Sequence, residues 1–133
     1  VVLPRIDEDL LPHLRASADG TLQPGVCRTR PDRVVGVVLA SGGYPESFET
    51  GLPIEGLDRV PPDALVFHAG TALRDGRVVT NGGRVLNVTG VGDDIGAARS
   101  AAYAAADLIT WQGARRREDI ALVASGGGTR KTG

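Results

Sequence analysis

Residues 34–45 read VVGVVLASGGYP. The first seven of them, 34–40, are mostly β-branched and do not alternate with polar residues, a pattern that favours a strand buried on both faces. That strand is expected to end abruptly, because 41–45 is a cluster of turn-forming residues. The following stretch, 46–63, is rich in Gly, Pro and acidic residues. It is expected to be an irregular connection with room for one short strand.

Further strands are predicted downstream. Residues 65–69 form a second apolar run, and 84–89 alternates well enough for another strand. Between 72–74 and 77–80, the dipeptide Asp75-Gly76 is a strong signal for a type I′ hairpin. Neighbouring strands joined by tight turns predict a mainly antiparallel sheet.

Two helices are predicted. Apolar residues recur at helical spacing over 8–18, and Asp19-Gly20 provides a stop signal. A second helix is expected over about 95–109, because Asp93 and Asp94 offer an N-cap and negative charge in the first turn. Its apolar face is mostly alanine, which lets a helix lie close against a sheet. The sequence therefore predicts an α/β domain of the α+β type, a mainly antiparallel sheet packed by two helices.

The composition excludes several classes of function. At 133 residues the chain fits one domain. Its 15 basic and 16 acidic residues give a net charge of −1, so neither a nucleic-acid nor a membrane partner is expected. The absence of a bilayer-length apolar run and of a signal-peptide pattern predicts a cytoplasmic protein. Cys27, the single cysteine, excludes an internal disulfide and a cysteine-rich zinc site, and is expected to be at least half-buried.

The sequences of the two ends of the chain differ from that of a packed domain. Residues 1–5 form an apolar run without an initiator methionine, which suggests that the sequence was cut from something longer. Residues 122–133 are expected to be a disordered tail, because the stretch beyond 124 has no apolar residue to anchor it. Glycines in this tail lack the spacing of a phosphate loop.

Three segments, 40–45, 67–71 and 80–86, place small or polar residues at strand ends. Glycine pairs there let the backbone approach a ligand and point N–H groups at an anion, and an arginine can hold phosphate with two parallel hydrogen bonds. The segments are predicted to form a phosphate-facing wall. Its candidate residues are Ser41, Gly42, Gly43, Tyr44, His68, Gly70, Thr71, Asn81, Gly82, Gly83 and Arg84.

Each segment alone also has a simpler interpretation. Glycine pairs are often plain tight turns, and an arginine at the start of a strand is commonly solvated. His68 could act as a general base, but a hydrogen-bonded structural histidine is the more common case. No Ser/His/Asp order and no metal-ligand spacing are present. The Arg115–Arg117 run is expected to be a solvated helix exit.

Taken together and in this order, the three segments resemble the C-terminal domain of phosphoribosylamine–glycine ligases. The resemblance includes residues 3–5, Tyr103 and residues 116–120, and covers roughly 1–121. Residues 1–7 resemble the junction at which that family leaves its ATP-grasp domain. Asn87, Gly90 and the segment 111–114 depart from the family's usual pattern.

The resemblance implies an ATP-dependent ligase of purine biosynthesis that joins glycine to 5-phosphoribosylamine through a glycyl phosphate. ATP and Mg²⁺ (or Mn²⁺) would be bound mainly by residues absent from this chain, in the ATP-grasp portion of the same protein. A monomer is expected. The resemblance implies that residues 81–84 help bind the phosphoribosylamine phosphate, that His68, Gly70 and Thr71 line the same wall, and that residues 41–44 form an adjacent loop.

Two other interpretations stay open at this point. The domain could be a non-catalytic substrate- or partner-binding module that pairs with a separate ATP-grasp chain. It could also be the related C-terminal domain of biotin carboxylases or of other purine-pathway carboxylases, although the residue pattern of the three segments is not that of those families.

Overall fold

The structure is a computed structural model that describes residues 1–25 and 27–122. The expected disordered tail lies outside the described residues from position 123 onward. The order of elements is η1 (Leu3–Arg5), α1 (Leu11–Ala18), β1 (Arg33–Ala40), η2 (Leu57–Arg59), β2 (Ala64–His68), β3 (Thr71–Arg74), β4 (Arg77–Thr80), β5 (Arg84–Gly92) and α2 (Ile95–Leu108).

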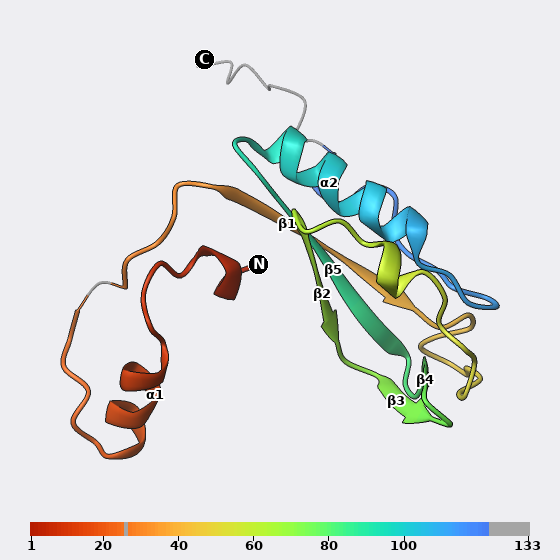
Figure 1. Cartoon of the computed structure of the whole chain (residues 1–133), viewed down its shortest axis with the longest axis horizontal. Helices are drawn as coiled ribbons and strands as arrows, with labels where there is room; N and C mark the ends of the chain where they lie inside the picture. Colours follow the sequence, from red (N-terminus) through yellow and green to blue (C-terminus); the bar gives the residue numbers. More distant parts are fainter. Residues whose placement is uncertain (26, 123–133) are drawn as a thin grey trace.

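The main sheet has three antiparallel strands in the order β1-β5-β2 (Figure 1). Strands β3 and β4 form a separate two-stranded hairpin. Its turn residues Asp75 and Gly76 have φ values of 50° and 75°, as a type I′ turn requires at both central positions. The predicted hairpin and the predicted α+β class, with antiparallel sheets and two helices, are confirmed.

Helix α2 covers one face of the main sheet (Figure 1). Its N-terminus is capped as predicted, because Asp94 Oδ1 accepts a hydrogen bond from the Ala97 N–H at 2.7 Å. The small side chains bring the helix very close to β5. A Cβ added at Gly90 would lie 2.3 Å from backbone atoms of both Ala98 and Ala102. Glycine at this position is therefore what allows the helix to pack on the strand.

The core lies between α2 and the sheet. Side chains of β1 at Val35, Val37 and Leu39 are buried, and their partners on β5 lie on the same face. The opposite face, here called the open face, leaves Val38 40% exposed and Phe67 39% exposed. The expectation that residues 34–40 are buried on both faces was therefore wrong, because a helix covers only one of them.

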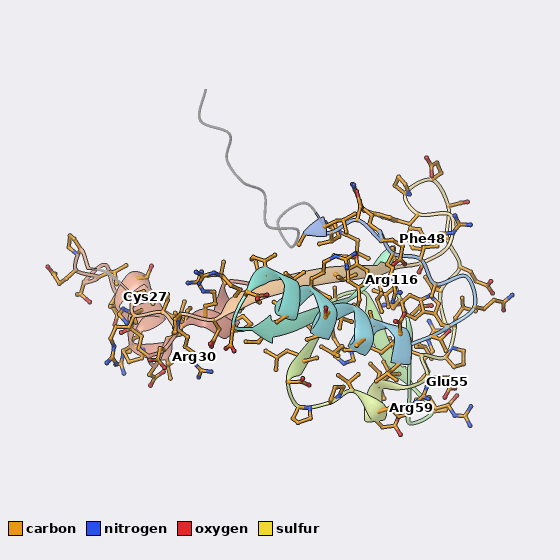
Figure 2. The ribbon with its side chains drawn as sticks, turned by 90° about the horizontal axis from the view of Figure 1, so that it is seen from above. Cys27, Arg30, Phe48, Glu55, Arg59 and Arg116 are labelled. Atoms are coloured by element: carbon orange, nitrogen blue, oxygen red, sulfur yellow. The ribbon has the colours of Figure 1, made fainter. Side chains whose placement is uncertain are left out.

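The N-terminal part of the chain extends away from this core (Figure 1). Helix α1 begins at Leu11, later than predicted, where Asp9 Oδ1 accepts the Leu11 N–H at 3.0 Å, and none of its residues is buried. Figure 2 places Cys27 in this part, at the opposite end of the molecule from Phe48. Cys27 is exposed, so its expected burial was wrong. In the part of the chain that the structure describes, no helix has the length and apolarity to cross a membrane.

Candidate functional site

The three predicted segments meet at one end of the main sheet, here called the rim. Strands β1 and β2 both end where the antiparallel strand β5 begins, so the topology brings their flanking residues together. The Ser41 N–H donates to the Gly83 carbonyl at 2.8 Å, and Ser41 Oγ donates to the Gly82 carbonyl at 2.9 Å. On the other side, the Gly70 N–H donates to the Arg84 carbonyl at 3.0 Å. The three segments thus converge at the rim.

Glycines at the rim permit contacts that larger residues would block. A Cβ on Gly70 would lie 2.9 Å from the Gly82 Cα, so the two backbones touch. A Cβ on Gly83 would lie 1.9 Å from Cδ2 of Tyr44, because the Tyr44 ring covers this glycine. The glycine pair at 82–83 therefore does more than make a turn, since it lets the loop 41–45 pack directly on the start of β5.

A β-bulge determines where Arg84 points. Leu39 pairs with Leu86, but the next residue, Ala40, pairs with Arg84, so Val85 is the extra residue on β5. Val85 is fully buried in the core, and Arg84 shares the open face with Ala40. Bulges of this kind re-aim side chains next to functional sites. Without the bulge, the alternation of the strand would turn Arg84 toward the α2 side.

The open face beside the bulge contains a groove of about 530 Å³, lined by Val38, Tyr44, Ala69, Gly70, Gly83, Arg84, Leu86 and Asn87. Four of these residues, Tyr44, Gly70, Gly83 and Arg84, were predicted from the sequence. Ala69 and Leu86 lie within the predicted segments without having been named as candidates. Val38 and Asn87 lie outside them, and the signal that could have found Asn87 is its polarity within the otherwise apolar run 85–88. Arg84 forms no side-chain hydrogen bond or ion pair with any residue in 1–25 or 27–122.

Other predicted residues lie at the rim without lining the groove. Ser41 is buried, and its hydroxyl holds the loop to β5. The exposed His68 has its Nδ1 3.0 Å from the Thr71 Oγ1, across the turn between β2 and β3. This is the arrangement of a hydrogen-bonded structural histidine, and no carboxylate among the described residues is paired with it.

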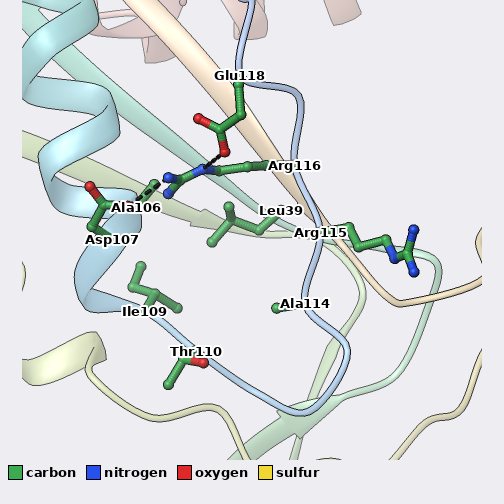
Figure 3. Close-up of a pocket in the computed structure, with 9 residues that line it drawn as sticks. All are labelled: Leu39, Ala106, Asp107, Ile109, Thr110, Ala114, Arg115, Arg116 and Glu118. Carbon is green, nitrogen blue, oxygen red and sulfur yellow. Dashed lines mark hydrogen bonds and ion pairs between the residues drawn. The ribbon is translucent and has the colours of Figure 1, made fainter.

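A second hollow, of about 520 Å³, lies between α2 and the segment 114–118 (Figure 3). Arg116 donates to Asp107 Oδ1 at 2.6 Å and to Glu118 Oε1 at 2.8 Å, with its side chain only 19% exposed. Partial burial opposes its charge, but these two carboxylates raise the pKa of Arg116 overall. Arg116 is thus a paired structural cation, and the expectation of a solvated 115–117 run was wrong for this residue.

Metal ligation finds no support in this part of the protein. Among residues 1–25 and 27–122 no group of three or more His, Cys, Asp or Glu side chains could hold a metal ion. The rim contains a cation, backbone amides and an amide side chain. These groups suit an anionic or hydroxylated ligand.

Comparison with known families identifies the domain. The family model described as "Phosphoribosylglycinamide synthetase, C domain" matches residues 34–123. The chain belongs to this family. The match includes β1, the rim, the groove and α2, so every element that positions the candidate site lies within the C domain.

The relatives and the solved structures agree with this assignment. The chain is 46% identical to a phosphoribosylamine–glycine ligase of Agrobacterium fabrum over 120 residues and 44% identical to that of Rhizobium meliloti. Each match covers 90% of this chain and 28% of the relative, so the chain spans little more than a quarter of their length. A crystal structure of the Thermotoga maritima ligase matches with a TM-score of 0.73 and 36% identity, over 90% of this chain and 29% of that one.

Proposed function

We propose that this C domain is part of an ATP-dependent ligase that joins glycine to 5-phosphoribosylamine. The products would be glycinamide ribonucleotide, ADP and phosphate, in purine biosynthesis. Membership of the family and the names of the relatives support this assignment. Because the chain spans only 28% of those relatives, the complete activity would belong to a longer protein. The 133-residue chain is expected to fold and not to catalyse.

The observation that carries the site assignment is the unpaired Arg84 on the groove. Its neighbours Gly82 and Gly83 bring backbone amides to the same end of the sheet, and Asn81 brings its side-chain amide, because the Asn81 backbone N–H already donates to the Gly70 carbonyl at 2.7 Å. A guanidinium forms two parallel, charge-assisted hydrogen bonds to a phosphate, which are stronger than neutral ones. We therefore assign the phosphate of 5-phosphoribosylamine to residues 81–84.

The remaining rim residues would shape the wall around the sugar. Gly70 and Tyr44 line the groove itself, Ser41 fixes the loop that carries Gly42, Gly43 and Tyr44, and His68 with Thr71 closes the turn beyond β2. Their chemical role is orientation. The amine of phosphoribosylamine must meet the carbonyl carbon of glycyl phosphate as the C–N bond forms and phosphate leaves, and such a step gains much of its rate from positioning.

The ATP chemistry is assigned to the rest of the protein. The described residues offer no carboxylate cluster for Mg²⁺ or Mn²⁺, so no step of the reaction is assigned to a metal bound here. ATP and its metal would sit in the ATP-grasp portion. In the relatives the matched segment is 28% of one longer chain, which favours an ATP-grasp portion in the same protein over a separate partner chain. We further propose a monomer that works in the cytoplasm.

Kinetics of an Arg84→Ala variant in the complete ligase test this proposal. Loss of a charge-assisted hydrogen bond costs about 1.5–3 kcal/mol, so kcat/KM for phosphoribosylamine should fall roughly 10- to 150-fold. The KM for ATP should stay the same. Arg77→Ala is the matched control, because Arg77 is exposed on β4 and lies off the groove. An Arg84→Ala enzyme with unchanged kcat and KM for phosphoribosylamine would rule out the phosphate contact.

A further inference from the structure

Asn87 occupies a position on the groove that the phosphate contact does not use. It lies in the middle of β5, directly opposite Val38 of β1. Paired residues of antiparallel strands lie on the same face, so Asn87 faces the open side with Val38 and Arg84. The residue is half-buried and lines the groove. A polar amide at this position, between the apolar residues Leu86 and Val88 in the chain, calls for a structural or functional explanation.

The Asn87 amide is held in one orientation by its neighbour on the same face. Thr89 Oγ1 donates a hydrogen bond to Asn87 Oδ1 at 3.2 Å, and Thr89 is fully buried. This contact occupies the carbonyl end of the amide. Nδ2 carries two donor hydrogens, and it has no hydrogen-bond partner within residues 1–25 and 27–122. The free end of the side chain is therefore its donor end.

Glycine on the adjacent strand makes room for this amide. A Cβ added at Gly36 would lie 2.9 Å from Asn87 Oδ1, 3.1 Å from Val1 Cγ1 and 3.4 Å from Asn87 Nδ2. Glycine inside a strand commonly marks a place where another group approaches closely. Here the Asn87 side chain approaches most closely, with Val1 beside it. Gly36, Asn87 and Thr89 thus form one arrangement that presents an amide donor beside the groove.

We propose that Asn87 is a sugar-binding residue whose Nδ2 donates a hydrogen bond to a hydroxyl oxygen of the bound phosphosugar. The proposal rests on the assignment of the phosphate to Arg84. Three strand residues separate the two Cα atoms by roughly 10 Å, so Asn87 meets a part of the ligand away from the phosphate. A neutral amide suits a hydroxyl oxygen, whereas the guanidinium suits the phosphate.

NMR titration of the 133-residue chain with two probes tests this proposal. Ribose 5-phosphate carries both the phosphate and the hydroxyls, whereas inorganic phosphate carries only the first. Asn87→Ala should weaken the binding of ribose 5-phosphate roughly 3- to 10-fold, the effect of one neutral hydrogen bond. Binding of inorganic phosphate should be unchanged. Asn87→Leu keeps the volume of the side chain and should give the same result if the alanine variant folds poorly.

The orientation by Thr89 has its own test. Thr89→Val removes the hydroxyl that holds the amide, so part of the affinity for ribose 5-phosphate should be lost while the spectrum stays that of a folded domain. Thr89→Ser keeps the hydroxyl and should restore the affinity. Equal affinity in the valine and serine variants would contradict the orienting role.

The possible failures are distinguishable. If Arg84→Ala leaves the binding of both probes unchanged, or the unmodified chain binds neither at millimolar concentrations, the phosphate assignment fails and the sugar contact fails with it. If Arg84→Ala weakens both probes but the Asn87 variants weaken neither, only the sugar contact is wrong. Equal weakening of both probes by the Asn87 variants also overturns it, because the effect would then not depend on the sugar.

Discussion

Removal of one hydroxyl group, by Tyr103→Phe, should destabilise the domain measurably. Tyr103 lies on α2 and is 8% exposed. Its hydroxyl donates to the Arg117 carbonyl at 2.6 Å and accepts the Ile120 N–H at 3.2 Å. The C-terminal segment is thereby fixed to the helix at two backbone groups. Phenylalanine removes both hydrogen bonds and keeps the ring.

The expected magnitude follows from these two bonds. Each contributes about 0.5–1.5 kcal/mol net, so the free energy of unfolding should fall by about 2 kcal/mol. The guanidinium carbons of Arg99 and Arg116 lie 4.4 and 5.2 Å from the Tyr103 ring centroid. Because a phenyl ring also attracts cations, these contacts remain in the variant and do not add to the loss of unfolding free energy. For a domain of this size the melting temperature should fall by roughly 6–10 °C.

Urea unfolding followed by circular dichroism measures this difference. Tyr44→Phe is the matched control, because Tyr44 is 42% exposed and its hydroxyl has no partner in the described part of the chain. The control should change the free energy of unfolding by less than about 0.5 kcal/mol. A Tyr103→Phe variant as stable as this control would show that the hydroxyl does not fix the C-terminal segment.

Two further predictions concern packing and charge. Gly90→Ala should lower the unfolding free energy by at least about 2 kcal/mol, because the new Cβ would displace α2 from the sheet. The control Gly25→Ala should be near neutral, because the nearest atom to its new Cβ is 4.0 Å away. Equal effects of the two substitutions would exclude the close approach of α2 to Gly90. The hydrogen bond from Arg117 lowers the pKa of Asp119, so this carboxyl stabilises the fold above its unfolded pKa and loses that contribution as the pH falls through its folded pKa. Carboxyl ¹³C shifts should show Asp119 titrating at higher pH in Arg117→Ala, and an unchanged titration would contradict the pairing.

Local signals predicted the local structure well. Asp75-Gly76 specifies its turn through backbone conformations that few residue pairs adopt, and Asp94 caps α2 through a side chain three residues from its partner. Both were predicted and both are confirmed. The convergence of the three glycine segments was also predicted, because each one follows or precedes a strand and antiparallel strands share their ends.

Features that depend on a partner strand were not predictable from the sequence alone. The bulge at Val85 changes the face on which Arg84 lies, and it arises only from the register between β1 and β5. Strand β5 continues to Gly92, beyond the predicted end at 89, because residues 90–92 pair with residues 33–35 of β1. Arg116 was expected to be solvated. Its ion pair with Asp107 forms only when the segment 114–118 folds back beside α2, and the sequence alone does not show this.

We propose that this domain supplies the substrate wall of a ligase and not its ATP chemistry. The most direct test joins residues 1–121 to the remaining portion of the Agrobacterium fabrum ligase, with which the chain shares 46% identity, and measures formation of glycinamide ribonucleotide from phosphoribosylamine, glycine and ATP. We expect product from the joined protein and none from the 133-residue chain alone. Product formation by the isolated chain, or a folded, ATP-binding joined protein that makes none, would contradict it.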